Sequence, residues 1–523
     1  MNTQINYKLL LLPFTLLLYC FFLNLSKIEI SFFHGTLHIL LQCSLLTALV
    51  FFPNSKIFRF LIAIFLSIKL FTELSYNSSL SISMVMSLFS STVSESLAFI
   101  QFNLFSVLVT ITFIITVGLA PVPSEKKYLK YLAFAGIIYL ILPLTYKANT
   151  FFSSEKFDNY KRTGLAKSQS HIFNLFEYVV EEEIALRLPA LKSIKGFTDS
   201  LAFFSSQQKG LNSTWKNVTD MNDNNKLLVL GIGESLRADH LSIYGYKRET
   251  TPQLSKLLHA ISLFDNTYAA GTNTWNSLPT ALTKSHDKPD LAKSIINLAK
   301  DAGYTTFWIS NHAQTSTWDH SVSAIANQAD HTFFYSDIKP GSVYDIDLVE
   351  KLKTIVLNQE NKTLVVLHFY GSHMQFSDRY PAEFSLFSSK NKILDEYDNS
   401  IIFTDHVQNE IINVVSNFNG KYLFFADHGL INPNGVLPLK HDVRTPPNLD
   451  SLKVPLFTFP KTDLLKNGTT KGFISLYYFE CIFSSWSEIT STDLTDNDYC
   501  QKNINNDQVQ FLDANLKQHK INL

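Results

Sequence analysis

The chain has little net charge, few cysteines, and no internal repeats or low-complexity tracts. Its 44 Lys and Arg residues nearly balance 45 Asp and Glu residues, which leaves a formal net charge of −1. A nucleic-acid partner or a strongly acidic ligand is therefore not indicated. Of only four cysteines, Cys20 and Cys43 lie in apolar runs and are expected to be packed thiols.

Cys481 and Cys500, the other two cysteines, lie in the polar second half of the chain. We predict that they form a disulfide, because they are close in sequence and that half is expected outside the cytoplasm. Oxidising conditions there preserve such bonds.

Aromatic residues, by contrast, are abundant, at 13% of the chain with 43 Phe. Together with the polar second half, this suggests a membrane part joined to a soluble part. A length of 523 residues also exceeds one ordinary domain. We expect a transmembrane domain at 1–147, a linker with bridging helices at 148–225, and a soluble domain at 226–523.

Five apolar segments in the first part are each close to the roughly 20 residues that a spanning helix needs. They are residues 9–25, 36–52, 57–74, 98–120 and 128–146. No small-residue cleavage site follows the first segment, so we interpret it as an uncleaved helix and not as a signal peptide. The sequence therefore predicts a transmembrane domain of five helices.

Basic residues indicate which loops face the cytoplasm. They gather before the first segment and at two junctions: Lys8; Lys56 and Arg59; Lys126, Lys127 and Lys130. The loop at 75–97 has no Lys or Arg, and Lys27 is the one exception to the pattern. The positive-inside rule then puts the N-terminus in the cytoplasm. Five crossings carry the soluble half to the outside, which is the periplasm in a Gram-negative cell.

The soluble half alternates strand-like and helical segments. The strands are expected at 227–230, 305–309, 363–369 and 422–425, and the helices at 290–302, 344–357 and 393–415. This alternation predicts an α/β domain with a mainly parallel sheet covered by helices on both faces. Before it, residues 173–194 are interpreted as one amphipathic bridging helix.

Potential metal-binding side chains follow two of these strands. Glu234 comes directly after the apolar run at 227–230 and Gly231-Ile232-Gly233, where open α/β sheets gather their ligands. Asp427 and His428 follow the strand at 422–425 and offer one oxygen and one nitrogen donor, both suited to zinc.

Two parts of the segment from Gly233 to Pro252, GESLRADH and YGYKRETTP, resemble the opening signature of the membrane-bound phosphoethanolamine transferases, in the alkaline phosphatase and sulfatase superfamily. That family includes enzymes that modify lipid A. The resemblance implies a sulfatase-like catalytic domain in which Glu234 is a zinc ligand. AGTNTWNSLP resembles the nucleophile loop, so Thr274 would attack phosphorus and also ligate zinc. Asp427 and His428, in the DHG motif, would complete the zinc site.

Further site residues follow from the same resemblance. His373 aligns with a GSH motif and His441 with the last histidine of the site; in relatives these contact the transferred phosphate or a second metal. Asn311, in WISN, would face the phosphate. Glu95, in the loop at 75–97, would face the ethanolamine ammonium of the donor lipid.

The chain departs from the family pattern at several positions. Ala270 and Thr280 stand where two cysteines flank the nucleophile, so that loop has no disulfide. Thr315 replaces a lysine that binds phosphate in many relatives, and Thr92 replaces an asparagine of the membrane loop. Leu430-Ile431 follows the DHG motif in place of Glu-Ser.

The resemblance implies a zinc-dependent transferase of the bacterial inner membrane with a periplasmic catalytic domain. It would move phosphoethanolamine from phosphatidylethanolamine onto Thr274 and then to an envelope acceptor such as lipid A or a lipopolysaccharide core sugar. A glucan or a protein acceptor stays open, because the same catalytic centre would serve each.

Three other interpretations stay open. A phosphoglycerol transferase also pairs five helices with a threonine nucleophile, although the YGYKRETTP segment argues against it. A sulfatase-like phosphodiesterase or hydrolase is the second, although the sulfatase motif of Cys or Ser, any residue, Pro, any residue, Arg is absent after Thr274. The third is a non-catalytic membrane protein with a relic domain, which the joint presence of four potential ligands disfavours.

Overall fold

The computed structural model describes residues 14–20, 32–51, 55–76, 93–120, 130–135 and most of 212–522, together with a few single residues between these ranges. The longest gaps in the last range are 313–319, 336–342, 432–438 and 463–472. The chain divides into two compact units, one of Met1–Ser81 with Phe99–Asp199 and one of Ile82–Ala98 with Ser200–Leu523. The predicted helix at 173–194 lies outside the described residues.

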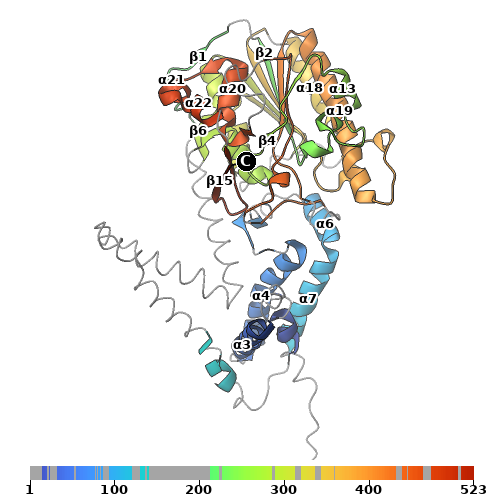
Figure 1. Cartoon of the computed structure of the whole chain (residues 1–523), viewed down its shortest axis with the longest axis vertical. Helices are drawn as coiled ribbons and strands as arrows, with labels where there is room; N and C mark the ends of the chain where they lie inside the picture. Colours follow the sequence, from blue (N-terminus) through green and yellow to red (C-terminus); the bar gives the residue numbers. More distant parts are fainter. Residues whose placement is uncertain are drawn as a thin grey trace, which may run out of the picture. The chain divides into compact units, whose positions relative to one another are not determined.

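The first unit is built from apolar helices, among them α3 (Phe32–Phe51), α4 (Lys56–Tyr76) and α7 (Leu104–Leu119) (Figure 1). Helices α3 and α4 correspond to the segments expected at 36–52 and 57–74. Tyr19 stacks on Phe113 of α7, with ring centroids 5.1 Å apart. The helices expected at 9–25 and 128–146 fall largely outside the described residues. Within the described part of the chain, no helix combines the length and the apolar character needed to cross a membrane.

The prediction of a single helix at 98–120 is wrong in one respect, because the helix is interrupted at Asn103. Helix α6 (Val93–Phe102) ends there and α7 begins one residue later. Phe99 O accepts both from Asn103 N and from the Asn103 side-chain amide, each at 3.0 Å. Hydrophobicity alone does not show where such a break falls.

The second unit contains a seven-stranded sheet with the order β3-β11-β10-β2-β9-β7-β8. The strands are β3 (Ser262–Leu263), β11 (Leu456–Phe459), β10 (Lys421–Ala426), β2 (Leu227–Gly233), β9 (Thr363–His368), β7 (Thr305–Ser310) and β8 (His331–Phe334). From β10 to β8 all neighbours are parallel, whereas β11 is antiparallel to both β10 and β3. The prediction of a mainly parallel sheet is confirmed, with all four expected strands in it.

Helices cover this sheet. Figure 1 shows α18 (Ile346–Asn358) and α19 (Lys392–Asn417) on one side of the strands and α20 (Phe479–Ser487) on the other. The helices expected at 344–357 and 393–415 are therefore confirmed as α18 and α19. Smaller helices are α13 (Pro252–Lys256), α14 (Thr274–Ala281), α15 (Ile295–Asp301), α16 (His320–Ala326), α21 (Thr492–Thr495) and α22 (Tyr499–Ile504).

The helix expected at 290–302 is only half correct. Its first half is strand β6 (Pro289–Ser294), which pairs antiparallel with β5 (Thr283–Ser285). Helix α15 begins at Ile295 because the Ser294 hydroxyl caps it, accepting from Asn297 N at 3.1 Å. Three other two-stranded sheets join β1 (Thr219–Asp220) to β13 (Ile489–Thr490), β4 (Thr267–Tyr268) to β12 (Ile474–Ser475), and β14 (Gln508–Leu512) to β15 (Gln518–Asn522).

The carboxyl ends of the central strands lie at one level. Ile232 of β2 pairs with His368 of β9, which in turn pairs with Ser310 of β7, and Gly233 pairs with Ala426 of β10. Every residue of β2 and β9 is buried, as in parallel sheets with both faces covered. The loops after these strands therefore emerge next to one another, where such sheets bind their ligands.

The disulfide between Cys481 and Cys500 is confirmed. It joins α20 to α22 across 19 positions, with a Cα–Cα distance of 5.4 Å. By the chain-entropy estimate a loop of this size contributes roughly 3 kcal/mol. Cys20 and Cys43 are both buried, as expected for packed thiols.

Glu480, next to this disulfide, should make stability fall as the pH rises. Its side chain is fully buried and accepts a hydrogen bond from the Tyr499 hydroxyl at 2.8 Å, while Oε2 has no hydrogen-bond partner among the described residues. Burial raises the pKa of Glu480 from 4.5 to about 8. Between these values the folded chain holds a proton that the unfolded chain has lost, so unfolding free energy should fall by roughly 1.4 kcal/mol per pH unit.

The variant Glu480→Gln isolates this effect, because it keeps the shape of the side chain but does not titrate. We expect it to match the wild type near pH 4.5 and to unfold at a clearly higher temperature at pH 8. Melting curves of both proteins across this range would test the expectation. Parallel pH profiles for the two would contradict it.

Candidate metal-binding active site

Four loops at the carboxyl ends of the strands supply the site. Glu234 follows β2, Asp427-His428 follows β10, Phe369–His373 follows β9, and Asn311 follows β7. The nucleophile candidate Thr274 comes from outside the sheet, as the first residue of α14. The sequence-predicted donors Glu234, Thr274, Asp427 and His428 thus meet in one cluster.

A tight turn holds Glu234 in place. The next residue, Ser235, has a left-handed backbone with φ of 56°, and its N–H donates to Asp427 Oδ1 at 3.1 Å. On the other side Ser372 N donates to Glu234 O at 3.0 Å. Gly371, with φ of 49°, packs so closely that a Cβ there would lie 2.8 Å from Glu234 O. The glycine of the GSH motif therefore permits this contact.

Helix α14 presents Thr274 to that turn. Asn273 caps the helix by accepting from Asn276 N at 3.2 Å, and the Asn276 side chain accepts from Asn273 N in return. The Thr274 hydroxyl donates to Glu234 Oε2 at 2.8 Å and lies 3.3 Å from His428 Nε2. The threonine hydroxyl is thus at a helix N-terminus and among potential metal ligands.

His428 turns a lone pair toward the carboxylates. Its Nδ1 donates to Gly429 O at 2.9 Å, which leaves Nε2 as the nitrogen without a hydrogen. Nε2 lies 3.4 Å from Glu234 Oε1 and 3.3 Å from Asp427 Oδ2. Asp427 Oδ1 accepts from two backbone amides, whereas Oδ2 is buried without a hydrogen-bond partner.

The charges of this cluster favour the binding of a cation. Burial and the adjacent Glu234 carboxylate raise the pKa of Asp427 well above its ordinary value. Burial also lowers the pKa of His428, so the imidazole is neutral. Two buried carboxylates without a balancing charge are costly. The donors that converge here are two carboxylates, a neutral ring nitrogen and a hydroxyl. This donor set fits a divalent metal ion.

His441 also reaches this centre. It is partly buried, and its ring meets that of His428 edge-on with centroids 4.9 Å apart. Ligand atoms of Glu234, His428 and His441 lie within 4.8 Å of one another, so these three form a possible metal-binding group. Burial, followed by the nearby His428, lowers the pKa of His441 to about 3.

The other predicted site residues are His373, Asn311 and Glu95. His373 stacks on Tyr370, with centroids 5.0 Å apart, in the loop after β9. It is close enough to Glu234 and His441 to influence the pKa of each. Asn311 donates its side-chain amide to Asp345 Oδ1 at 2.8 Å. Glu95 lies in α6, but its side chain is outside the described part of the structure.

Sequence reasoning missed Asp345, which ties two of the loops together. Its buried carboxylate accepts from Asn311, from Tyr370 N at 2.9 Å and from Gly371 N at 2.8 Å. It thereby fixes the turn that packs on Glu234. No local pattern marks Asp345, because its partners are distant in sequence.

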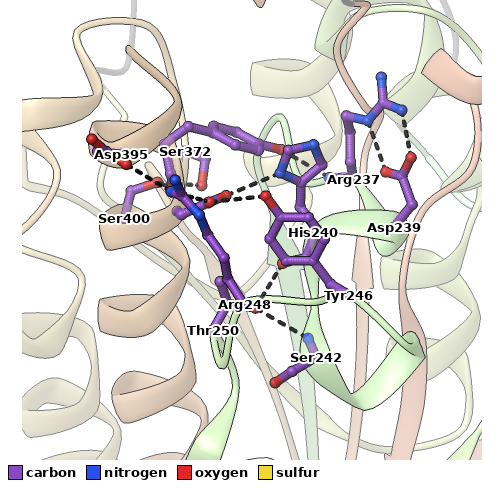
Figure 2. Close-up of polar contacts among 12 residues, drawn as sticks. Arg237, Asp239, His240, Ser242, Tyr246, Arg248, Thr250, Ser372, Asp395 and Ser400 are labelled. Carbon is purple, nitrogen blue, oxygen red and sulfur yellow. Dashed lines mark hydrogen bonds and ion pairs between the residues drawn. The ribbon is translucent and has the colours of Figure 1, made fainter. Parts of the chain in front are cut away.

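The RADH and YGYKRETTP segments are explained by contacts with α19 (Figure 2). Asp398, fully buried in that helix, accepts from His240 Nδ1 at 3.0 Å, Tyr246 Oη at 3.0 Å and Arg248 Nη1 at 2.9 Å. In Figure 2 Arg248 reaches toward Asp395 of the same helix, to which its Nη1 donates at 2.7 Å. The preceding residue Tyr397 donates its hydroxyl to Ser235 O at 2.9 Å. The residues of these two segments therefore attach the Glu234 turn to α19.

Comparison with known proteins agrees with this arrangement. Residues 226–489 match the family model described as Sulfatase. The phosphoethanolamine transferase EptC of Escherichia coli K12 is 30% identical over 227 residues, which cover 39% of each chain. The phosphoethanolamine transferase OpgE of the same strain is 29% identical over 299 residues and 54% of each chain. The chain thus spans about two fifths to half of these curated relatives.

Solved structures show the same fold. The integral membrane lipooligosaccharide phosphoethanolamine transferase A (EptA) from Neisseria meningitidis superposes with a TM-score of 0.69 at 16% identity, over 92% of this chain and 95% of that chain. The periplasmic domain of EptC from E. coli gives a TM-score of 0.52 at 23% identity, over 60% of this chain and 96% of that chain. Because the family match extends over half of its length, the chain belongs to the sulfatase family.

Proposed function

We propose that this protein is a zinc-dependent phosphoethanolamine transferase of the bacterial inner membrane. The observation that carries the proposal is the Thr274 hydroxyl, which donates to Glu234 Oε2 at 2.8 Å within a group of potential metal ligands. A hydroxyl in that environment suits nucleophilic attack on phosphorus. The names of the curated relatives support phosphoethanolamine as the transferred group.

The ligands for zinc would be Glu234, Thr274, Asp427 and His428, with His441 next to them. Oxygen and nitrogen donors in a tetrahedral set of four are what Zn²⁺ prefers. When bound, zinc would lower the pKa of the Thr274 hydroxyl and neutralise charge that develops on the phosphate. Asp427 Oδ2, which has no hydrogen-bond partner among the described residues, would then coordinate the ion.

In the first half-reaction Thr274 Oγ1 attacks the phosphorus of phosphatidylethanolamine. A bond forms between Oγ1 and phosphorus, and the bond from phosphorus to the diacylglycerol oxygen breaks in line with it. The Thr274 hydroxyl donates to Glu234 Oε2, so this carboxylate is placed to accept its proton. The departing diacylglycerol oxygen takes up a proton from His373, which regains one from the acceptor in the second half-reaction. The N-terminus of α14 favours the negative charge that develops there.

In the second half-reaction an acceptor hydroxyl attacks the phospho-threonine. The Thr274 Oγ1–phosphorus bond breaks, and the acceptor proton passes to His373 or His441. His441 is neutral at physiological pH, since its pKa is lowered to about 3; the ring can therefore accept a proton only transiently. We assign proton transfer mainly to His373, which stacks on Tyr370 beside the cluster.

The substrates follow from the same proposal. The donor is phosphatidylethanolamine in the bilayer, and the acceptor is an envelope glycolipid or glycan such as lipid A or the lipopolysaccharide core. Asn311 would orient the phosphate and Glu95 the ethanolamine ammonium. The catalytic unit would lie in the periplasm, and a fluorescent reporter that matures only in the cytoplasm should stay dark when fused after Leu523.

Mass spectrometry of envelope lipids and glycans, with and without the gene, tests the function. We expect one glycolipid or glycan to carry added phosphoethanolamine only when the gene is present and Thr274 is intact. Identical envelope profiles in cells with and without the protein would contradict the proposal.

A further inference from the structure

The hairpin of β14, β15 and their turn at 513–517, called the 508–522 hairpin, packs against the nucleophile loop. Leu512 N donates to Ala270 O at 2.8 Å, four residues before Thr274. Asn276 Nδ2 donates to Asp513 O at 3.0 Å, two residues after it. The hairpin therefore contacts the loop on both sides of the nucleophile.

Asn276 connects the hairpin directly to the helix cap. Its Oδ1 accepts from Asn273 N at 3.2 Å, while its Nδ2 donates to the hairpin. The fit around this amide is close, since a Cβ on Gly271 would lie 2.1 Å from Asn276 Oδ1. If the Asp513 carbonyl moved, the Asn276 side chain would move with it. That movement would displace Asn273, the residue that precedes Thr274.

The hairpin carbonyl is itself well fixed. Asp513 is fully buried, and its Oδ1 accepts from Asn515 N at 2.8 Å and Lys517 N at 3.0 Å. Its Oδ2 lies 2.9 Å from His519 Nε2 on the returning strand. These contacts within the hairpin restrain the turn, so that Asp513 O is held in one position.

An apolar contact adds a third attachment. Leu516, at the tip of the hairpin turn, packs against a small apolar cluster of Trp275, which directly follows Thr274, and Ile82. Ile82 belongs to the same compact unit. The hairpin therefore also meets the nucleophile loop through this apolar cluster.

We propose that the 508–522 hairpin sets the position of Thr274, with Asn276 and Leu516 as positioning residues; this rests on the proposed role of Thr274 as nucleophile. In-line attack is sensitive to displacements of about 1 Å. The loop has no cysteine of its own that could cross-link it, because Ala270 and Thr280 flank the nucleophile. Hydrogen bonds and packing from the hairpin supply the restraint.

Two variants test the proposal in the full-length protein. One changes a residue of the nucleophile loop, and the other changes a residue of the hairpin. Asn276→Asp keeps the oxygen that accepts from Asn273 N and removes the donor to Asp513 O. Leu516→Ala weakens the packing against the cluster of Trp275 and Ile82 without adding charge. The matched control is Gln518→Ala, which breaks the hydrogen bond from Gln518 Nε2 to Tyr477 Oη, a hairpin contact at 3.1 Å that involves no residue of the nucleophile loop.

Hydrogen exchange followed by mass spectrometry reports on the loop without any substrate. We expect exchange in the peptide spanning 270–281 to rise roughly 10-fold or more in both variants and to stay at the wild-type rate in the control. For phosphoethanolamine transfer, kcat should fall roughly 10- to 100-fold with KM and bound metal unchanged.

Wild-type exchange of that peptide in both variants would overturn the proposal. So would a kcat in both variants equal to that of Gln518→Ala, because the hairpin would then be merely structural. If the wild-type protein transfers no phosphoethanolamine, the proposed function fails instead, and the exchange rates alone decide whether the hairpin restrains the loop.

Discussion

Thr274→Ala should abolish phosphoethanolamine transfer, with a loss of roughly 10³-fold or more in kcat. The expected loss is large because no other hydroxyl in the described site lies against both Glu234 and His428, at 2.8 Å and 3.3 Å. Bound metal should fall only in part, since Glu234, Asp427 and His428 remain. Transfer is measured with purified protein and phosphatidylethanolamine, and metal content by elemental analysis.

Two further variants separate the nucleophile from general effects on the loop. Thr274→Ser keeps a hydroxyl and should retain part of the activity. Thr272→Val is the matched control, because the Thr272 hydroxyl is buried without a hydrogen-bond partner and nearby in sequence. It should be close to wild type. Full activity in Thr274→Ala, or equal losses in the Thr272 and Thr274 variants, would be incompatible with a threonine nucleophile.

Glu234→Gln should lower both metal affinity and activity. The amide keeps the shape and can still accept the Thr274 hydroxyl hydrogen, but it carries no charge to bind a divalent cation. Substituting residues that only hydrogen-bond to metal ligands already lowers metal affinity by about 10- to 100-fold. We therefore expect the loss of a ligand charge to lower metal affinity by at least about 100-fold, and kcat to fall by a similar or larger factor.

The control for this charge change is Glu410→Gln, an identical substitution on α19 whose carboxylate contacts only nearby asparagines in the described structure. It should leave metal content and transfer unchanged. Competition with a chelator of known affinity measures the metal dissociation constant of each protein. Wild-type metal affinity in Glu234→Gln would remove Glu234 from the ligand set.

The metal-binding cluster could be predicted from the sequence because its residues directly follow buried strands. The runs before Glu234 and Asp427 are apolar over several residues, and parallel strands in register bring their ends together. Family resemblance was needed to give these residues a role, and to find Thr274 and His441, which do not directly follow a predicted strand.

What could not be predicted depends on contacts between distant residues. Asp345 and Asp398 hold the loops through buried carboxylates, yet neither belongs to a local motif. The 508–522 hairpin carries no motif of its own, and only the structure shows that it contacts residues on both sides of Thr274. The break at Asn103 likewise leaves no signal in the hydrophobic pattern of the segment at 98–120.

The central claim, that Thr274 carries phosphoethanolamine between two half-reactions, is tested most directly by trapping the covalent intermediate. Purified protein would be incubated with phosphatidylethanolamine without an acceptor, denatured in acid, digested and analysed by mass spectrometry. We predict that the peptide containing Thr274 carries added phosphoethanolamine on that residue, and that the adduct is lost in Glu234→Gln and when acceptor is supplied. Efficient transfer by the same preparation with this peptide always unmodified, or with the group on another residue, would contradict the claim.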